Sequence, residues 1–211
     1  MIAVVTLAEM ENEMGILQSW DAGNDTTLAQ VEKFPDPRYL ELFNQHMCAE
    51  YPILPWRAVQ TEEEKEKQKL LDERLQQKFQ IRLALLTSDE KWIGWSHGWQ
   101  DAIHTGDFYM ASSLVLPDYR EKKLYSEMVK KILQLTAQEG FSGVRSRHLC
   151  TNNAVLIAKL KLGFMINGFE QDETMGTLVR MTYYHNDLRR RAACFRAGKV
   201  AEPGILESLL K

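Results

Sequence analysis

The feature that most constrains the fold is an abrupt change of hydrophobic period at Pro117. Before Pro117, apolar residues follow the two-residue period of strands in three runs joined by short polar links. These runs span residues 81–87, 92–100 and 108–116. After it, Leu124, Met128 and Ile132 recur on one face of a helix that Gly140 ends. We therefore predict an antiparallel meander whose last strand leads directly into a helix.

The C-terminal half continues with strands and helices. We predict a strand over about 143–149, followed by a helix that Asn152 caps and Gly163 ends. Two extended runs then follow, over 164–169 and 175–185.

The N-terminal region is more mixed in character. The apolar run at residues 2–7 can form a strand, and residues 21–25 have the composition of a turn. Helical spacing predicts a helix over about 37–50. Thr61 and Glu64 then form a capping box that opens a charged helix.

These elements predict one α/β domain of the α+β kind over residues 1–185, with a helical appendage at 186–211. Residues 1–80 would supply the first strand and covering helices, and residues 81–185 the core. The appendage ends in leucines at helical spacing. Because exposed leucines usually dock on the chain's own core or on another subunit, a homodimer through the C-terminal segment is one expectation.

Charge and composition narrow the class of protein. The chain has 26 basic and 29 acidic side chains, a formal charge of −3, which argues against a strongly basic nucleic-acid binder or a polybasic membrane-surface protein. No apolar stretch approaches the roughly 18 residues that span a bilayer, and the N-terminal run lacks the basic segment of a signal peptide. Cys48, Cys150 and Cys194 are too far apart for a metal site and odd in number. We expect a cytoplasmic protein with no metal, nucleic-acid or membrane partner.

The junction at Pro117 is also the leading candidate for a binding site. A strand ends there and a helix begins near Lys122, so free backbone N–H groups and the positive end of the helix dipole point at one spot. Arg120, Lys122 and Lys123 add positive charge. A cofactor with phosphate groups would fit this junction, and the alternative is an ordinary link with solvated basic side chains.

With a second segment about thirty residues later, this junction resembles the GCN5-related N-acetyltransferase superfamily. The family loop usually reads Val-x-Pro-x-Tyr-Arg-Gly-x-Gly-[Ile/Leu]-[Gly/Tyr], and its later helix reads Asn-x-x-Ala-x-x-Leu-Tyr-x-Lys-Leu-Gly-Phe. The matching residues are Val115, Pro117, Tyr119, Arg120, Leu124 and Tyr125 in the loop, and Asn152, Lys161, Leu162, Gly163 and Phe164 in the helix. The resemblance covers roughly residues 80–185.

The resemblance implies the acyl-CoA N-acyltransferase fold, a mixed and mainly antiparallel sheet whose central strand pair splays apart between flanking helices. It also implies transfer of an acetyl group from acetyl-CoA to the primary amine of a small molecule or peptide by direct attack. Strand 108–116 would part from strand 143–149 and pair with the pantetheine arm through the backbone of Ser113, Leu114 and Val115. A backbone N–H near Leu114 would stabilise the oxyanion.

The resemblance further implies which residues hold the cofactor. At the pyrophosphate these are Arg120, Glu121, Lys122, Lys123, Leu124, Tyr125 and Ser126. Asn152 would hydrogen-bond the pantetheine arm from the other side.

Three departures from the family pattern bear on cofactor binding and catalysis. Glu121 and Lys123 stand where the family has glycines, and a loop without glycine can form if its residues keep negative φ. Lys159 stands where the family usually places a tyrosine that protonates the departing thiolate. A lysine ammonium or a water molecule can serve as that acid, or the reaction is lost. The alternative to an enzyme is a catalytically degenerate module that keeps the fold for binding or assembly.

Several further residues have two interpretations each. His97 is the first choice for a general base near neutral pH, or it is a histidine at the surface or core edge. Asp101 and Asp107 can attract an amine, or they are solvated turn acids. Trp92, Trp95 and Trp99 can line an acceptor pocket or belong to the core. Cys150 is expected to be a small buried residue.

Overall fold

A computed structural model of the chain describes residues 13–48, 61–75, 79–89, 91–101 and 106–196. The described strands form one sheet in the order β1-β2-β3-β4-β5-β6-β8-β7. Their bounds are β1 (Ile16–Gly23), β2 (Thr26–Val31), β3 (Gln80–Thr87), β4 (Trp92–Gln100), β5 (Asp107–Val115), β6 (Gly143–Leu149), β7 (Met165–Asp172) and β8 (Gly176–Tyr184). Neighbouring strands are antiparallel except for β5 and β6, which are parallel. The predicted mixed, mainly antiparallel sheet is confirmed.

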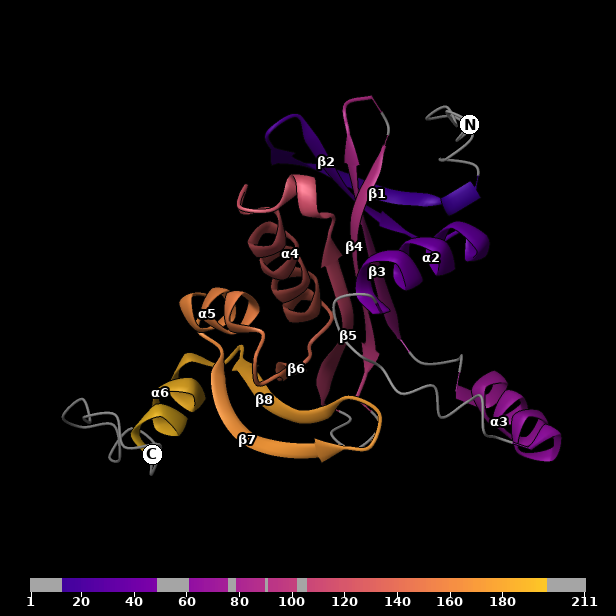
Figure 1. The fold of residues 1–211 in the computed structure, drawn as a ribbon. Helices are drawn as coiled ribbons and strands as arrows, with labels where there is room; N and C mark the ends of the chain where they lie inside the picture. Colours follow the sequence, from indigo (N-terminus) through magenta and orange to yellow (C-terminus); the bar gives the residue numbers. More distant parts are fainter. Residues whose placement is uncertain (1–12, 49–60, 76–78, 90, 102–105, 197–211) are drawn as a thin grey trace.

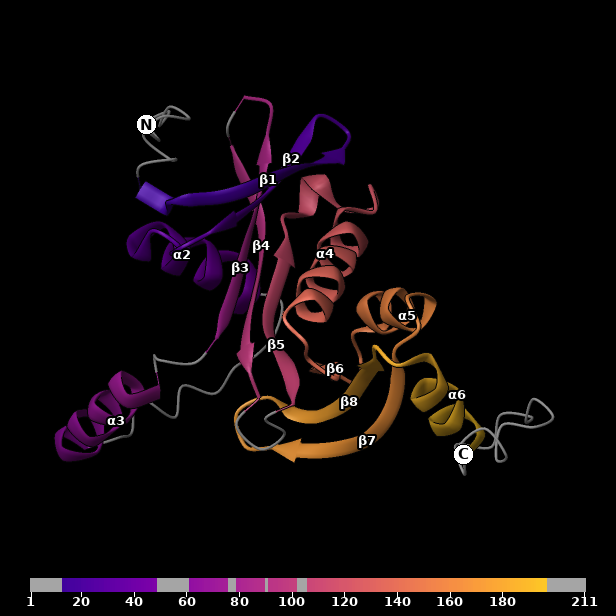
Figure 2. The same cartoon turned by 180° about the vertical axis from the view of Figure 1, so that it is seen from behind.

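Helices cover both faces of this sheet. They are α2 (Asp36–Leu42), which continues into a π-helical segment (Phe43–Cys48), α3 (Glu62–Leu75), α4 (Leu124–Gln138), α5 (Asn153–Lys161) and α6 (Asp187–Arg196). The two opposite views show α2 on one face of the central strands and α4 on the other (Figures 1 and 2). Among the described residues, no helix is long and apolar enough to cross a membrane.

The apolar spacing and the capping box that predicted helices α4 and α3 have the expected roles in the structure. Leu124, Met128 and Ile132 are buried along one face of α4, and Gly140 follows its end with a φ of +83°. The Thr61 N–H donates to Glu64 Oε2 at 2.8 Å while the Glu64 N–H donates to Thr61 Oγ1 at 3.2 Å, so the capping box is confirmed.

The N-terminal region differs from the prediction. Asn24 and Asp25, both with φ of +54°, join β1 and β2 in a tight turn whose positive φ values are typical of a two-residue hairpin. The sequence predicted the turn but not the flanking strands. The predicted strand at residues 2–7 and the C-terminal leucines lie outside the described residues, so the homodimer stays a prediction.

A bulge marks the middle of the sheet. His97 pairs with Ser112 and Gly98 pairs with Met110, so Ala111 of β5 has no partner residue on β4. An extra residue increases the local twist of a strand. The bulge therefore coincides with the point where β5 turns away from β6.

Gly98 allows β4 to approach β5 closely beside this bulge, and its substitution tests that approach. A Cβ atom at Gly98 would lie 2.2 Å from the Tyr109 carbonyl oxygen and 2.7 Å from the Phe108 ring. We expect Gly98→Ala to destabilise the protein by roughly 1–3 kcal/mol, measured by thermal or denaturant unfolding. In the control Gly168→Ala, the nearest atom to the new Cβ is at 3.4 Å in the Arg180 side chain. Equal stability of the two variants would contradict the close approach.

Candidate active site

A slot opens between β5 and β6. Their pairing ends at Met110 and Ser146, whereas β6 stays paired with β8 as far as Leu149. Beyond Met110, residues 111–115 follow β4 alone, so on their other edge main-chain groups lack a partner strand among the described residues. The predicted residues Ser113, Leu114 and Val115 lie on this open stretch. The splayed strand pair is confirmed.

The loop at the end of β5 folds back on the strand before α4 begins. A short 3₁₀ turn spans Pro117–Tyr119. Arg120 then donates from Nε to the Val115 carbonyl at 3.0 Å. This hydrogen bond holds the loop against the open end of the slot.

The loop adopts a glycine-like backbone without glycine. Glu121 and Lys123 both have φ of +63°, so the expectation that a loop without glycine keeps negative φ is wrong. Each residue forced into this region costs roughly 1–2 kcal/mol. The backbone path that suits the family's glycines is therefore kept although the side chains disfavour it.

Neighbouring side chains hold the loop in this path. The Lys122 carbonyl accepts a hydrogen bond at 3.1 Å from Nδ2 of Asn24 in the β1–β2 turn. The Lys122 and Lys91 ammonium groups lie 5.1 and 5.4 Å from the centroid of the Tyr119 ring. Three separate parts of the chain thus meet at the loop.

The first turn of α4 points its backbone amides into this corner. Lys123 is the N-cap residue and makes no side-chain capping bond, and the first N–H groups of a helix have no acceptor within the helix. An anion there would also meet the positive end of the helix dipole and the nearby lysines. The geometry suits a pyrophosphate, whose binding stays a prediction.

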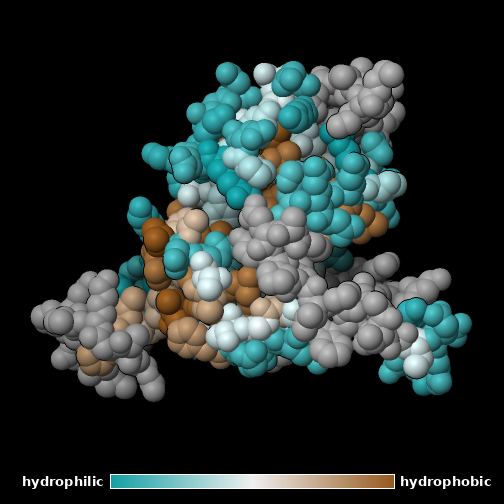
Figure 3. Space-filling model, in the orientation of Figure 1, coloured by the Kyte–Doolittle hydropathy of each residue, from teal (hydrophilic) through white to brown (hydrophobic). Residues whose placement is uncertain are grey.

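The second motif forms the helix on the other side of the slot. Asn152 caps α5 by accepting a hydrogen bond from the Val155 N–H at 3.3 Å, and its contact with a pantetheine arm stays a prediction. Ile157 and Leu160 of α5 are exposed, and Figure 3 shows apolar surface over this helix. Cys150 is exposed as well, so the expectation that it is buried is wrong.

Lys159 lies at the apex of the slot. It is fully buried, and its Nζ donates to Ser146 Oγ at 2.7 Å and lies 3.4 Å from Met110 Sδ. These are the two residues at which the pairing of β5 with β6 ends. The Phe164 ring centroid is 4.4 Å from the ammonium. Burial lowers the pKa of Lys159 to about 7, so the side chain can give up a proton near neutral pH.

Ser146 connects Lys159 to a histidine. The Ser146 hydroxyl lies 3.0 Å from His148 Nε2. Burial, and secondly the charge of Lys159, lower the pKa of His148 well below its ordinary value. Because a neutral His148 can accept from the hydroxyl, the three groups form a chain from Lys159 through Ser146 to His148. The sequence analysis did not predict this chain of hydrogen bonds. Its signal was the two-residue period of the strand over 143–149, which places Ser146 and His148 on the same face.

His97 lies on the opposite face of the sheet. Its ring packs against Phe34, Tyr39 and Trp99, and its buried Nδ1 has no hydrogen-bond partner among the described residues. Burial, with a smaller contribution from Arg82, lowers the pKa of His97 to about 4. The prediction of a base that titrates near neutral pH is wrong, and the core-edge interpretation is correct.

The tryptophans and aspartates near the slot have different environments. Trp92 and Trp95 belong to the core, and Trp99 lines a cavity. Asp107 is buried and paired with Arg145 rather than solvated. Asp101 is partly buried at the rim of the cavity.

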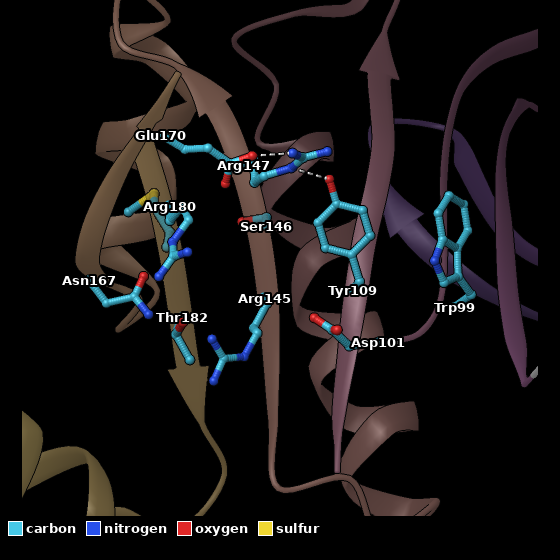
Figure 4. A pocket seen from close by; sticks show the side chains of 11 residues that line it. Trp99, Asp101, Tyr109, Arg145, Ser146, Arg147, Asn167, Glu170, Arg180 and Thr182 are labelled. Carbon is cyan, nitrogen blue, oxygen red and sulfur yellow. Dashed lines mark hydrogen bonds and ion pairs between the residues drawn. The ribbon is translucent and has the colours of Figure 1, made fainter. Parts of the chain in front are cut away.

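This cavity, of about 290 Å³, lies where β5 and β6 begin to part. It is lined by Trp99, Asp101, Tyr109, Arg145, Ser146, Arg147, Asn167, Glu170, Arg180, Met181 and Thr182. Figure 4 shows the arginines of β6 and β8 on one side, with Tyr109 and Trp99 on the other. Arg147 crosses from β6 to β5 by donating from Nε to the Tyr109 hydroxyl at 2.9 Å. None of its arginines was predicted, because they come from strands outside the motifs.

Known structures share this architecture. No family model and no curated protein matches the chain. Spermidine N-acetyltransferase from Vibrio cholerae, solved in complex with CoA and spermine, matches 77% of this chain and 96% of its own, with a TM-score of 0.56 and 15% identity. A dodecameric structure of that enzyme in an intermediate state matches 77% and 95%, with a TM-score of 0.55 and 15% identity.

A shorter match is to nourseothricin acetyltransferase, with a TM-score of 0.47 and 12% identity over 51% of this chain. This chain spans 66% of that protein's length. At the identities found, the spermidine N-acetyltransferase structures establish the fold. The chain has the predicted acyl-CoA N-acyltransferase fold.

The positive φ of Glu121 predicts that substitution by glycine stabilises the folded protein. Glu121→Gly removes roughly 1–2 kcal/mol of backbone strain against about 0.5–1 kcal/mol of added chain entropy. We expect a net stabilisation that raises the Tm by about 2–4 °C for each kcal/mol gained. The control Glu139→Gly alters an exposed glutamate with φ of −77° and should lower the Tm. A lower Tm for Glu121→Gly would contradict the strain.

Buried Lys159 predicts a pH-dependent stability. Its pKa of about 7 in the folded protein lies below the ordinary value of 10.5. Between these pH values the unfolded chain binds more protons, so stability rises with pH, by on the order of 1 kcal/mol per pH unit from this group. We expect Lys159→Met to remove this contribution, measured by denaturant unfolding from pH 7 to 10. Lys161→Met alters an exposed lysine and should keep the wild-type slope. An unchanged slope in Lys159→Met would show that Lys159 titrates normally.

Proposed function

We propose that the chain transfers an acetyl group from acetyl-CoA to a primary amine. The observation that carries the proposal is the parting of β5 from β6 at Met110 and Ser146, with the first turn of α4 at one end and Lys159 at the apex. The fold shared with N-acetyltransferases supports it.

The residues along the slot fit an acyl-CoA. Open main-chain groups of Ser113, Leu114 and Val115 can hydrogen-bond an extended amide-bearing arm as a neighbouring strand would. The amides of residues 121–126 and the side chains of Lys122 and Lys123 can hold the pyrophosphate. When bound there, acetyl-CoA would supply an activated thioester carbonyl.

The protein's own groups then have two tasks. A backbone N–H near Leu114 stabilises the negative charge that develops on the carbonyl oxygen as the amine attacks. As the C–S bond breaks, Lys159 donates a proton to the leaving thiolate, and the proton lost by the nitrogen of the attacking amine restores the charge of Lys159. Ser146 and His148 position the Lys159 ammonium through the hydrogen bonds described above. Orientation of the two reactants accounts for most of the rate gain.

The second candidate is a module that keeps the fold without transfer. It is favoured by the carboxylate of Glu121 in the loop and by Arg120, which uses its Nε to bind the Val115 carbonyl. Such a module would not need the backbone amides of the loop to bind phosphate.

Acetyl-CoA binding separates the two candidates. We expect a ligand-induced thermal shift, since a hundredfold excess over the Kd adds about 2.7 kcal/mol of stability. Lys123→Glu should weaken binding at least fivefold because it places a negative charge beside the pyrophosphate. Lys33→Glu, an exposed lysine after β2, should bind as the wild type does. No shift at millimolar acetyl-CoA would favour the module.

Turnover tests the chemistry separately from binding. With acetyl-CoA and an amine, Lys159→Met should bind acetyl-CoA normally and lose 10²-fold or more of the rate, as general-acid removal does. Full activity of Lys159→Met would exclude it as the acid.

A further inference from the structure

We propose that the acceptor amine carries a carboxylate, and that the donor cluster formed by Arg180, Asn167, Thr182 and Arg145 binds it. This inference rests on the proposed function, because it assigns the acceptor of the same site. It begins from the cavity beside the slot.

The cavity lies on the acceptor side of the sheet. Side chains alternate along a strand, so the side chains of Arg145 and Arg147 project into the cavity. Ser146 also lines the cavity, but its hydroxyl bonds Lys159 on the other face. Figure 4 shows the arginines and Tyr109 projecting together into this space. A molecule in the cavity would therefore reach the apex of the slot from the face opposite Lys159.

Two of the three arginines are already neutralised. Arg145 pairs with buried Asp107 at 2.5 Å. Arg147 pairs with Glu170 at 2.5 Å and lies 3.5 Å from Asp172. Asp107, Glu170 and Asp172 are therefore each paired with an arginine of the protein.

Arg180 remains without such a partner. It lies directly opposite Arg147 in the pairing of β6 with β8, and it is exposed. Among the described residues it forms no ion pair, although like charges directly opposite each other destabilise a sheet. An anionic ligand would relieve this repulsion and could accept two parallel hydrogen bonds from the guanidinium.

A buried hydroxyl beside Arg180 also lacks a partner. Thr182 is 1% exposed, and no described group hydrogen-bonds its Oγ1. Thr182 pairs in register with Arg145 and lines the cavity. Leaving such a group unsatisfied costs roughly 1–3 kcal/mol. A ligand oxygen in this part of the cavity would satisfy it.

The chemistry of the cluster selects a carboxylate over a second amine. Arg180 and Arg145 offer only donors, and the Asn167 amide beside Arg180 and the Thr182 hydroxyl can donate too (Figure 4). A polyamine would bring further positive charge against Arg180, with Glu170 and Asp107 already paired. On the other side of the cavity, Trp99 and Tyr109 offer ring surface to a carbon chain.

Three acceptors of equal length test the inference. They are 5-aminopentanoate, 5-aminopentanamide and 1,5-diaminopentane, which end in a carboxylate, a neutral amide and an ammonium. The reacting amine is far enough from the variable end to be similarly basic in all three. We expect kcat/KM for the carboxylate to exceed the other two values by at least tenfold. In Arg180→Gln that preference should disappear, and in Arg180→Lys it should partly persist because the charge remains without the paired donors.

Controls separate this inference from the proposed function. Arg189→Gln on α6 alters an exposed arginine away from the cavity and should keep the preference. Acetyl-CoA binding by Arg180→Gln should equal that of the wild type, which also shows that the variant is folded. If acetyl-CoA binds, equal turnover of the three acceptors, a preference for the diamine, or turnover of none of them overturns the carboxylate assignment. A protein that binds no acetyl-CoA overturns the proposed function instead.

Discussion

The contact on which the site depends is that of Lys159 with the last two paired residues of the parting strands. Its ammonium donates to Ser146 on β6 and lies against the sulfur of Met110 on β5, so one buried group marks the point where the sheet opens. Burying an amine is unfavourable in itself, and the lowered pKa expresses that cost. A leucine or methionine of similar volume would fill the same space without the cost of burying an amine. The lysine supplies what an apolar side chain cannot, which is a proton donor fixed at the apex of the slot.

The two faces of the sheet carry different chemical environments, although only the sheet itself separates them. The face of α4 and α5 carries the first main-chain amides of α4 and the buried chain of Lys159, Ser146 and His148. On the opposite face, the aromatic cluster around Tyr39 and the arginines of β6 and β8 form an apolar and cationic wall. Within the part of the chain that the structure describes, the parting of β5 from β6 beyond Met110 and Ser146 connects the two faces. Under the proposed function, the acetyl donor and the acceptor amine would approach this opening from opposite faces of the sheet.

Much of this arrangement can be predicted from local sequence patterns. The rest depends on contacts between residues that are far apart in the sequence. The strands of the meander, α4, α5 and the capping box of α3 were predictable because their signals are local. β1 and β2 were missed because the strands around Asn24 and Asp25 lack clear alternation. The pKa of His97 depends on Phe34 and Tyr39, which approach it from a distant helix and its preceding loop. Arg180 could not be linked to Arg147 before the register of β8 on β6 was known.

The loop at Glu121 and Lys123 shows how strongly the surroundings determine a backbone. Both residues hold a conformation that their side chains disfavour, whereas a glycine at either position would hold it without strain. The turn at Asn24, the ring of Tyr119 and the bond from Arg120 to Val115 fix both ends of the segment. With its ends fixed, the chain has few other paths from β5 into α4. A lysine at position 123 places a positive charge directly at the start of α4, which glycine cannot do. The cost of that charge is the backbone strain of a positive φ.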